Sequence, residues 1–272
     1  MSSMVRNTNF PPKNQETLKV SEIFHSIQGE GICAGTPSVF LRLATCNLHC
    51  WFCDTKYTWL FSEEMEKTVR KEMEKLAIKE ENQPKDVHVY NPSSEIRLMG
   101  IDFARKEIEK YNCGHLVITG GEPLLQQKPL SVLLHKLRKG IGEIFVEVET
   151  SGSVRPTGEI IPYVDQWNVS LKLASSGNPK EIREKSQAIR DLKNLRGAFF
   201  KFVVQNREDL KEIEEIARRY AVSPEKIILM PEGVSKEEIA ERSSWIAKAC
   251  SESGYRFTTR LQILLWGNVR GK

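Results

Sequence analysis

The sequence lacks long apolar runs. Nowhere in its 272 residues does it approach the roughly 18 consecutive apolar residues that a membrane-spanning helix needs. The first residues, MSSMVRNTNFPPKNQ, lack the apolar core of a signal peptide. We therefore expect a cytoplasmic protein with no membrane segment, whose cysteine thiols stay reduced.

Blocks of charge of one sign are also missing. Lys and Arg (40 together) are interspersed with Asp and Glu (36 together), and the formal net charge is only +4. Such a pattern does not predict direct nucleic-acid binding, which requires basic residues gathered on one face. The small positive balance suits a small, acidic substrate.

The chain has six cysteines but only one closely spaced group of them. Cys46, Cys50 and Cys53 form a C-x3-C-x2-C segment, and the other three stand singly. Thiolates at this spacing converge on one compact soft-metal centre. A closed zinc site would need a fourth ligand, for which His49 is the candidate. Three ligands without a fourth suit a [4Fe–4S] cluster that leaves one iron open.

Strand and helix patterns alternate along the chain. Strands are predicted at residues 18–24, 38–44, 115–119, 143–148, 166–171, 198–204, 226–229 and 260–266. Helices are predicted at residues 62–79, 101–111, 130–139, 207–220 and 236–251. This alternation implies a parallel sheet with right-handed crossovers. About six βα units are too few for a complete eightfold barrel, so we predict an α/β fold, a partial (open) β/α barrel.

We expect one domain over residues 18–272, preceded by a flexible lead-in over residues 1–17. A charged helical insertion is predicted near residues 62–85. Ser62 is its expected N-cap, and Val69 and Met73 belong to its narrow apolar face. The many Glu–Lys pairs of this helix favour a solvated surface position.

A second motif, Thr119-Gly120-Gly121-Glu122-Pro123, follows a predicted strand. Two glycines let the backbone approach a ligand closely, and the glutamate can accept a hydrogen bond from an ammonium group. In isolation this segment would simply be a turn. Its place at a strand end, beyond the cysteine segment, makes it a candidate ligand site.

The cysteine triad followed by TGGEP resembles the radical S-adenosylmethionine superfamily. Within that superfamily, EIFHSIQGEG at residues 22–31 is similar to the N-terminal signature of the 7-carboxy-7-deazaguanine synthases. The resemblance covers residues 18 to about 267. Its other segments are Arg42, Cys53-Asp54-Thr55, Glu149-Thr150-Ser151-Gly152, Ser170-Leu171-Lys172, Lys201-Phe202-Val203-Val204 and Met230-Pro231.

The resemblance implies a ring-contracting lyase that feeds 7-deazapurine (queuosine or archaeosine) biosynthesis. In this family the open iron chelates the amino and carboxylate groups of S-adenosylmethionine, and reduction yields a 5′-deoxyadenosyl radical. The radical abstracts hydrogen from C6 of 6-carboxy-5,6,7,8-tetrahydropterin. Ammonia is lost, 7-carboxy-7-deazaguanine forms, and the cofactor is regenerated. Mg²⁺ assists the rearrangement, and the residue matching the family's metal contact is Thr55.

The resemblance also implies roles for individual residues. The catalytic set is Glu30, Arg42 and Glu149. The substrate set is Ile27, Gln28, Gly29, Arg42 and Thr119, in which Arg42 is suited to hold the substrate carboxylate in a bidentate fork. The cofactor set is Phe52, Asp54, Gly121, Glu122, Ser170, Lys172, Leu229, Met230, Pro231 and Glu232. Gln262 and Trp266 are candidates for the C-terminal wall of the substrate pocket.

Several alternatives stay open at this point. A glycyl-radical enzyme activase shares the triad and GGEP but needs no QGEG segment, and a non-enzymatic zinc module needs neither. Arg42 could pair with a structural carboxylate, Thr55 could cap a turn, and Glu30 could be a surface charge. An electron-donor protein such as a flavodoxin or ferredoxin, and a homodimer, are expected from the family alone.

Overall fold

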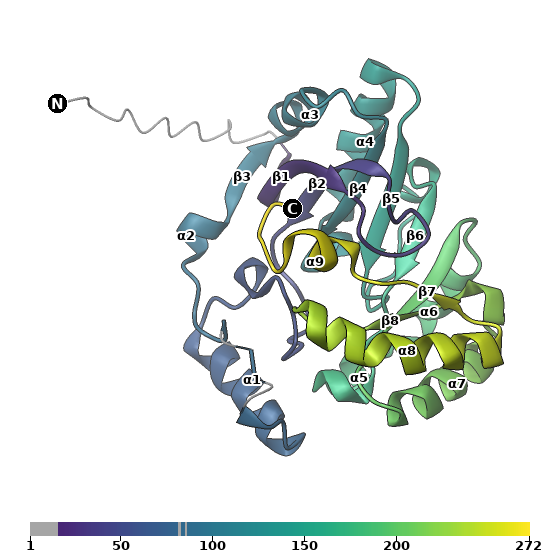
Figure 1. Cartoon of the computed structure of the whole chain (residues 1–272). Helices are drawn as coiled ribbons and strands as arrows, with labels where there is room; N and C mark the ends of the chain where they lie inside the picture. The colour runs from purple at the N-terminus through teal and green to yellow at the C-terminus, as the bar shows by residue number, and fades with distance from the viewer. Residues whose placement is uncertain (1–15, 81–82, 85) are drawn as a thin grey trace.

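A computed structural model describes residues 16–80, 83–84 and 86–272, and its strands form one nine-stranded sheet (Figure 1). The sheet order is β3-β1-β2-β4-β5-β6-β7-β8-β9, and β3 and β9 are its open edges. From β2 to β9 all neighbours pair in parallel, whereas β1 pairs antiparallel with β2 and β3. The strands are β1 (Thr17–Ile27), β2 (Pro37–Leu43), β3 (Arg97–Gly100), β4 (His115–Gly120), β5 (Phe145–Thr150), β6 (Gln166–Val169), β7 (Ala198–Val204), β8 (Ile227–Pro231) and β9 (Arg256–Phe257).

Helices connect the parallel strands and cover the sheet (Figure 1). They are α1 (Glu63–Lys75), α2 (Pro92–Glu95), α3 (Ile101–Glu109), α4 (Gln127–Ile141), α5 (Lys180–Arg183), α6 (Ser186–Lys193), α7 (Glu208–Tyr220), α8 (Lys236–Ser253) and α9 (Leu261–Trp266). Within the described ranges, none of these helices has both the length and the apolarity needed to cross a membrane.

The strands are buried because they are short apolar runs that amphipathic helices cover. All five residues of β8 are buried, as expected for a parallel strand covered on both faces. In α7, Ile213, Ile216 and Tyr220 recur at helical spacing and are all buried against the sheet. The expected open β/α barrel is thus confirmed.

One face of the sheet is polar at its centre. Glu147 on β5 and Asn168 on β6 are completely buried, and Lys201 on β7 is nearly so. The Asn168 amide donates hydrogen bonds to Glu147 (2.5 Å) and to Glu149 (2.8 Å), the next residue on the same face of β5. Lys201 in turn donates to Glu149, so hydrogen bonds link these buried polar side chains across the sheet.

Two expectations about the ends of the chain need revision. The strand predicted at residues 260–266 is wrong, because α9 (Leu261–Trp266) is helical and buries Ile263. A short apolar run has no periodicity that separates strand from helix. Most of the predicted lead-in, residues 1–15, lies outside the described residues, whereas Thr17 already belongs to β1.

Candidate active site

The cysteine segment leaves the end of β2 as a loop that presents its three sulfur atoms to hydrogen-bond donors. The Leu48 amide lies 3.4 Å from Cys46 Sγ, and Asn178 Nδ2 lies 3.2 Å from Cys50 Sγ. Cys53 Sγ accepts from the Trp59 indole N–H at 3.3 Å. N–H groups aimed at sulfur stabilise thiolates and tune the potential of iron–sulfur clusters.

The electrostatics of the segment also fit a cluster. Burial raises the pKa of the Cys50 thiol to about 11 and raises that of Cys46 further, and Cys53 adds to both shifts. Three neighbouring thiolates therefore need cationic compensation, which the iron of a cluster supplies. His49, the alternative fourth ligand, stacks on Trp59 with ring centroids 4.9 Å apart. The donor set therefore fits a [4Fe–4S] cluster held by three cysteines.

The TGGEP segment runs alongside the cysteine loop as a continuation of the β2–β4 pairing. The Gly121 amide donates to the Leu43 carbonyl at 3.0 Å, and the Glu122 amide donates to the Thr45 carbonyl at 2.9 Å. A Cβ atom at Gly120 or Gly121 would lie 2.0 Å from one of these carbonyl oxygens. Glycine is required here because the two backbones touch.

Glu122 is fully buried within its own loop. Its carboxylate accepts hydrogen bonds from the Leu124 amide, the Thr150 hydroxyl, and both the amide and the hydroxyl of Ser151, at 2.5–3.0 Å. This set of donors joins the TGGEP segment to the end of β5. The carboxylate therefore organises the loop, while Gly120 and Gly121 face the adjoining cavity.

Helix α1 covers the cysteine loop. Val69 and Met73 are buried against Trp51, Trp59 and Leu60, in a hydrophobic cluster separate from the main core. The expected apolar face is confirmed by this packing, but the helix does more than lie on the surface. It shields one side of the cysteine loop from water.

We expect Met73→Ala to lower the free energy of unfolding by about 2–4 kcal/mol, because it empties a buried site in this cluster. The same change should speed the loss of cluster absorbance in air. Chemical denaturation and bleaching kinetics measure the two effects. Glu74→Ala, one exposed position further along α1, is the matched control. Equal bleaching rates for both variants would contradict a shielding role for α1.

A cavity of about 180 Å³ opens beside the three cysteines. It is lined by most of the expected cofactor set, namely Phe52, Asp54, Gly121, Ser170, Lys172, Met230 and Glu232. Lys172 Nζ donates to Ser170 Oγ at 2.8 Å, which holds the amine at the cavity wall. Three other members of the expected cofactor set are not among the described residues that line this cavity: Glu122, Leu229 and Pro231. Leu229 is fully buried in the main core.

A second cavity of about 410 Å³ adjoins the first. It is lined by the whole expected substrate set, Ile27, Gln28, Gly29, Arg42 and Thr119, and by Thr55. Both cavities share the residues Glu30, Asp54, Thr55, Thr119, Gly120, Glu149 and Arg260. A ligand in either cavity would therefore be in contact with the same central wall.

Arg42 faces the larger cavity while pairing with a protein carboxylate. Its Nε donates to Glu22 at 2.8 Å, and its guanidinium lies 5.4 Å from the centre of the Phe24 ring. Arg42 thus does pair with a carboxylate of the protein, the alternative role stated for it above. The ion pair and the ring fix the plane of the guanidinium at the cavity wall.

The central wall is a network of buried charges. Lys201 Nζ lies 2.7 Å from Glu30 and 2.8 Å from Glu149, and Arg260 Nε lies 3.1 Å from Glu30. Arg260 also pairs with Asp54 and donates to the Gly233 carbonyl at 2.7 Å. Glu30 is therefore not a surface charge. It is the acceptor at the centre of this network.

The two carboxylates beside Lys201 differ in their pKa values. Burial alone would raise the pKa of Glu30, but Lys201 and Arg260 hold it well below its usual range. Burial raises the pKa of Glu149 to about 7. Lys201 lowers this pKa, but the negative charges of Glu147 and Glu30 oppose that effect. The wall thus combines a permanent carboxylate with one that changes protonation more readily.

Sequence reasoning assigned no role to Arg260 or Lys201, although both belong to this wall. Gln262, the candidate for the C-terminal side of the substrate pocket, lines the larger cavity and donates to Glu30 at 2.8 Å. Trp266 is 37% exposed and is absent from the described lining. Residues 267–272 also line the larger cavity.

The chain is similar to known proteins in sequence and in fold. A family model described as a 4Fe-4S single cluster domain matches residues 27–155. A 7-carboxy-7-deazaguanine synthase of Pyrobaculum aerophilum is 37% identical over 257 residues, covering 94% of this chain and 97% of that protein. The synthase of Halobacterium salinarum is 33% identical over 274 residues, covering 93% and 91%. The crystal structure of QueE from Escherichia coli has a similar fold, with a TM-score of 0.61, 24% identity, and coverage of 90% and 94%.

Proposed function

The chain belongs to the 7-carboxy-7-deazaguanine synthase family, and we propose that its two adjoining cavities hold S-adenosylmethionine and a carboxylated pterin on either side of one charged wall. The protein is an enzyme, a carbon–nitrogen lyase. It converts 6-carboxy-5,6,7,8-tetrahydropterin to 7-carboxy-7-deazaguanine, a precursor of 7-deazapurines. Its cofactors are a [4Fe–4S] cluster and S-adenosylmethionine.

The observation that carries the placement is the shared wall. The smaller cavity begins at Cys46, Cys50 and Cys53, and the larger one ends at Gln28 and Arg42. When bound, the cluster and S-adenosylmethionine supply a 5′-deoxyadenosyl radical. Because both cavities share this wall, that chemistry would act next to the pterin.

On the cofactor side, the chain binds and orients. Cys46, Cys50 and Cys53 would hold the cluster, and the backbone at Gly121 offers a close approach to the methionyl end. Ser170 and Lys172 lie where hydrogen bonds to the adenosyl portion are available. Phe52 and Trp51 pack around the loop and exclude water from it.

On the substrate side, the chain offers a cation, an amide and carboxylates. Arg42 would attract the carboxylate of the pterin, and the rigid segment Gln28–Gly29 would contact the ring. A Cβ at Gly29 would overlap the end of the Gln262 side chain, which would have to move. Glu30 and Glu149 face both cavities, and Glu149 is the candidate for holding a proton near the reacting ring.

Mg²⁺ is assigned to Thr55, which lines both cavities beside the Asp54 carboxylate. We expect Thr55→Ala to weaken Mg²⁺ binding at least tenfold, by about 1.4 kcal/mol, so that turnover responds less to added Mg²⁺. Cluster content should stay the same, since Cys53 remains. Titrating turnover with Mg²⁺ and measuring iron test the two parts. An unchanged metal response would remove Thr55 from the site.

The other readings are not favoured. A glycyl-radical activase must admit a segment of a protein partner, whereas the larger cavity of about 410 Å³ matches a small molecule. A zinc module would leave the charged wall and the substrate set without a purpose.

We propose a flavodoxin or ferredoxin as the electron donor and a homodimer as the assembly. We propose the cytoplasm as the compartment, since all six cysteines are free.

The experiment that tests this function is an anaerobic incubation with reductant, S-adenosylmethionine, Mg²⁺ and 6-carboxy-5,6,7,8-tetrahydropterin, read by mass spectrometry. We expect 7-carboxy-7-deazaguanine to accumulate with the native chain. Cys50→Ala, which removes one cluster ligand, should form none above background. Equal signals from the two proteins would overturn the proposal.

A further inference from the structure

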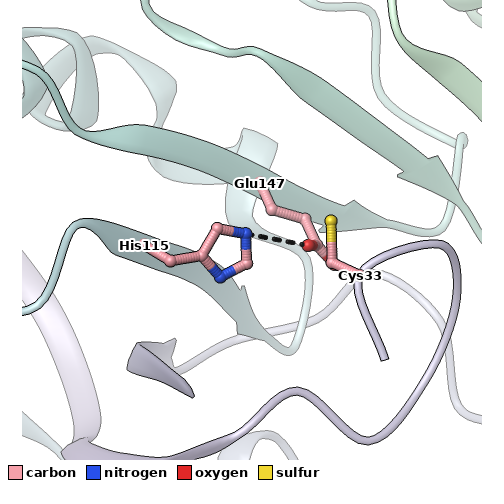
Figure 2. A group of neighbouring side chains, drawn as sticks. All are labelled: Cys33, His115 and Glu147. Atoms are coloured by element: carbon pink, nitrogen blue, oxygen red, sulfur yellow. Dashed lines mark ion pairs between the residues drawn. The ribbon is translucent and has the colours of Figure 1, made fainter. Parts of the chain in front are cut away.

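Three potential metal ligands meet away from the cysteine triad (Figure 2). Cys33 lies in the turn between β1 and β2, His115 begins β4, and Glu147 lies in the middle of β5. Their ligand atoms all lie within 4.8 Å of one another. His115 and Glu147 are buried, whereas Cys33 is half-buried and leaves a route from solvent.

The hydrogen bonds of Ser38 fix the orientation of the histidine. Ser38 Oγ donates its one hydrogen to the Thr36 carbonyl at 2.9 Å, so it accepts from His115 Nδ1 at 2.6 Å. In the neutral imidazole the lone pair therefore lies on Nε2. A hydrogen bond of this kind, donated by the ring nitrogen that does not face the ion, is typical of histidines that bind metals.

This lone pair faces an acceptor. His115 Nε2 lies 3.4 Å from Glu147 Oε2, and neither atom has a hydrogen-bond partner among the described residues (Figure 2). Two buried acceptors that face each other are unfavourable unless a cation lies between them. Either a proton on the histidine or a metal ion can supply that charge.

The separation favours the metal ion. A charge-assisted N–H···O bond is about 2.7–2.9 Å long, which is shorter than observed here. Two ligand atoms at about 2.1 Å from a tetrahedral zinc ion lie about 3.4 Å apart, which matches the observed distance. The thiolate of Cys33 and the carboxylate of Glu147 would together balance the charge of a divalent cation.

We propose that Cys33, His115 and Glu147 form a second metal site, separate from the cluster, that takes a divalent zinc-class cation. Cys33 Sγ, His115 Nε2 and Glu147 Oε2 are the ligands, and a fourth position is open to water or to Gln166 Oε1, which lies 3.4 Å from Sγ. Forming the metal–sulfur bond releases the thiol proton to solvent.

The site would hold the substrate loop in place. Glu147 uses its other oxygen, Oε1, to accept from the side chains of Gln28 and Asn168. Gln28 lines the larger cavity, and Cys33 lies in the same connection between β1 and β2. An ion that binds Cys33 and Glu147 together therefore joins the Gln28-containing loop to the centre of the sheet.

The test uses the anaerobic enzyme with its cluster intact, equilibrated with Zn²⁺, desalted and analysed for zinc and iron. We expect one zinc ion per chain in the native protein and in Cys113→Ala, which removes another half-buried free cysteine. Cys33→Ala and His115→Gln should lower zinc at least tenfold while iron stays constant. The native protein and Cys113→Ala, but not Cys33→Ala, should gain thermal stability with zinc.

Zinc-edge X-ray absorption of the native protein gives a readout that needs no variant. The proposal predicts one sulfur ligand at about 2.3 Å with nitrogen and oxygen ligands at about 2.0–2.2 Å. Three sulfur ligands would instead place the zinc in the cysteine triad and overturn the proposal. A native protein that retains no zinc would also overturn it, and would leave a proton as the charge between His115 Nε2 and Glu147 Oε2.

Discussion

Lys201→Met is expected to lower kcat/KM about 10²–10³-fold. The change removes the cation that pairs with the buried carboxylate of Glu149 and one of the two cations that pair with Glu30, which keeps Arg260. Breaking a buried pair in this way costs about 3–5 kcal/mol, much of it as the uncompensated charge. Steady-state kinetics with S-adenosylmethionine and pterin varied separately would show which ligand depends on Lys201.

A double variant separates loss of stability from loss of alignment. Lys201→Met/Glu149→Gln removes the lysine together with one of its two carboxylates, so much of the lost stability should return. Activity should not return, because the Glu149 carboxylate is then absent and Arg260 is the one cation of this network that still pairs with Glu30. Recovery of both stability and activity in the double variant would show that Lys201 serves the fold alone.

Arg260→Ala is expected to have the second large effect, a loss of about 10²-fold or more in kcat/KM. Arg260 is the residue that joins three segments: Glu30 after β1, Asp54 beside the cysteine triad, and the Gly233 carbonyl after β8. Its removal takes away the ion pair of Asp54, leaves Glu30 paired with Lys201 alone among the cations of this network, and releases the start of α9. Product assays measure the activity, and chemical denaturation measures the stability.

The matched controls for Arg260 test charge and geometry. Arg260→Lys keeps the charge but loses the planar fork, so we expect it to recover only a small part of the activity. Arg256→Ala alters an exposed arginine four residues earlier, which donates to the Glu225 carbonyl, and should stay near native activity. Full activity in Arg260→Lys would contradict the bridging role.

The strands and most helices follow from local patterns because their apolar residues are spaced for burial. The run at residues 198–204 was predicted with the bounds that β7 has, and α7 was predicted within one residue. The short strands β3 and β9 and the helix α6 were not predicted. β3 and β9 lie at the edges of the sheet, where few residues are buried and the apolar signal is weak.

The site was predictable where motifs hold it and not where the tertiary fold assembles it. The cysteine triad and QGEG carry their own signal, and Gln28, Gly29 and Glu30 of QGEG line a cavity. Arg260 has no local signal, because its partner Glu30 is 230 residues away in the chain. Likewise, the sequence predicted the apolar face of α1, but not the contact of this face with Trp51 and Trp59.

The most direct test of the central claim is one anaerobic assay over several turnovers, with 6-carboxy-5,6,7,8-tetrahydropterin deuterated at C6. Mass spectrometry would follow both the product and S-adenosylmethionine. We predict 7-carboxy-7-deazaguanine in several-fold excess over enzyme, with deuterium appearing in S-adenosylmethionine. Absence of the product, or product formed with no deuterium in the cofactor, would contradict it.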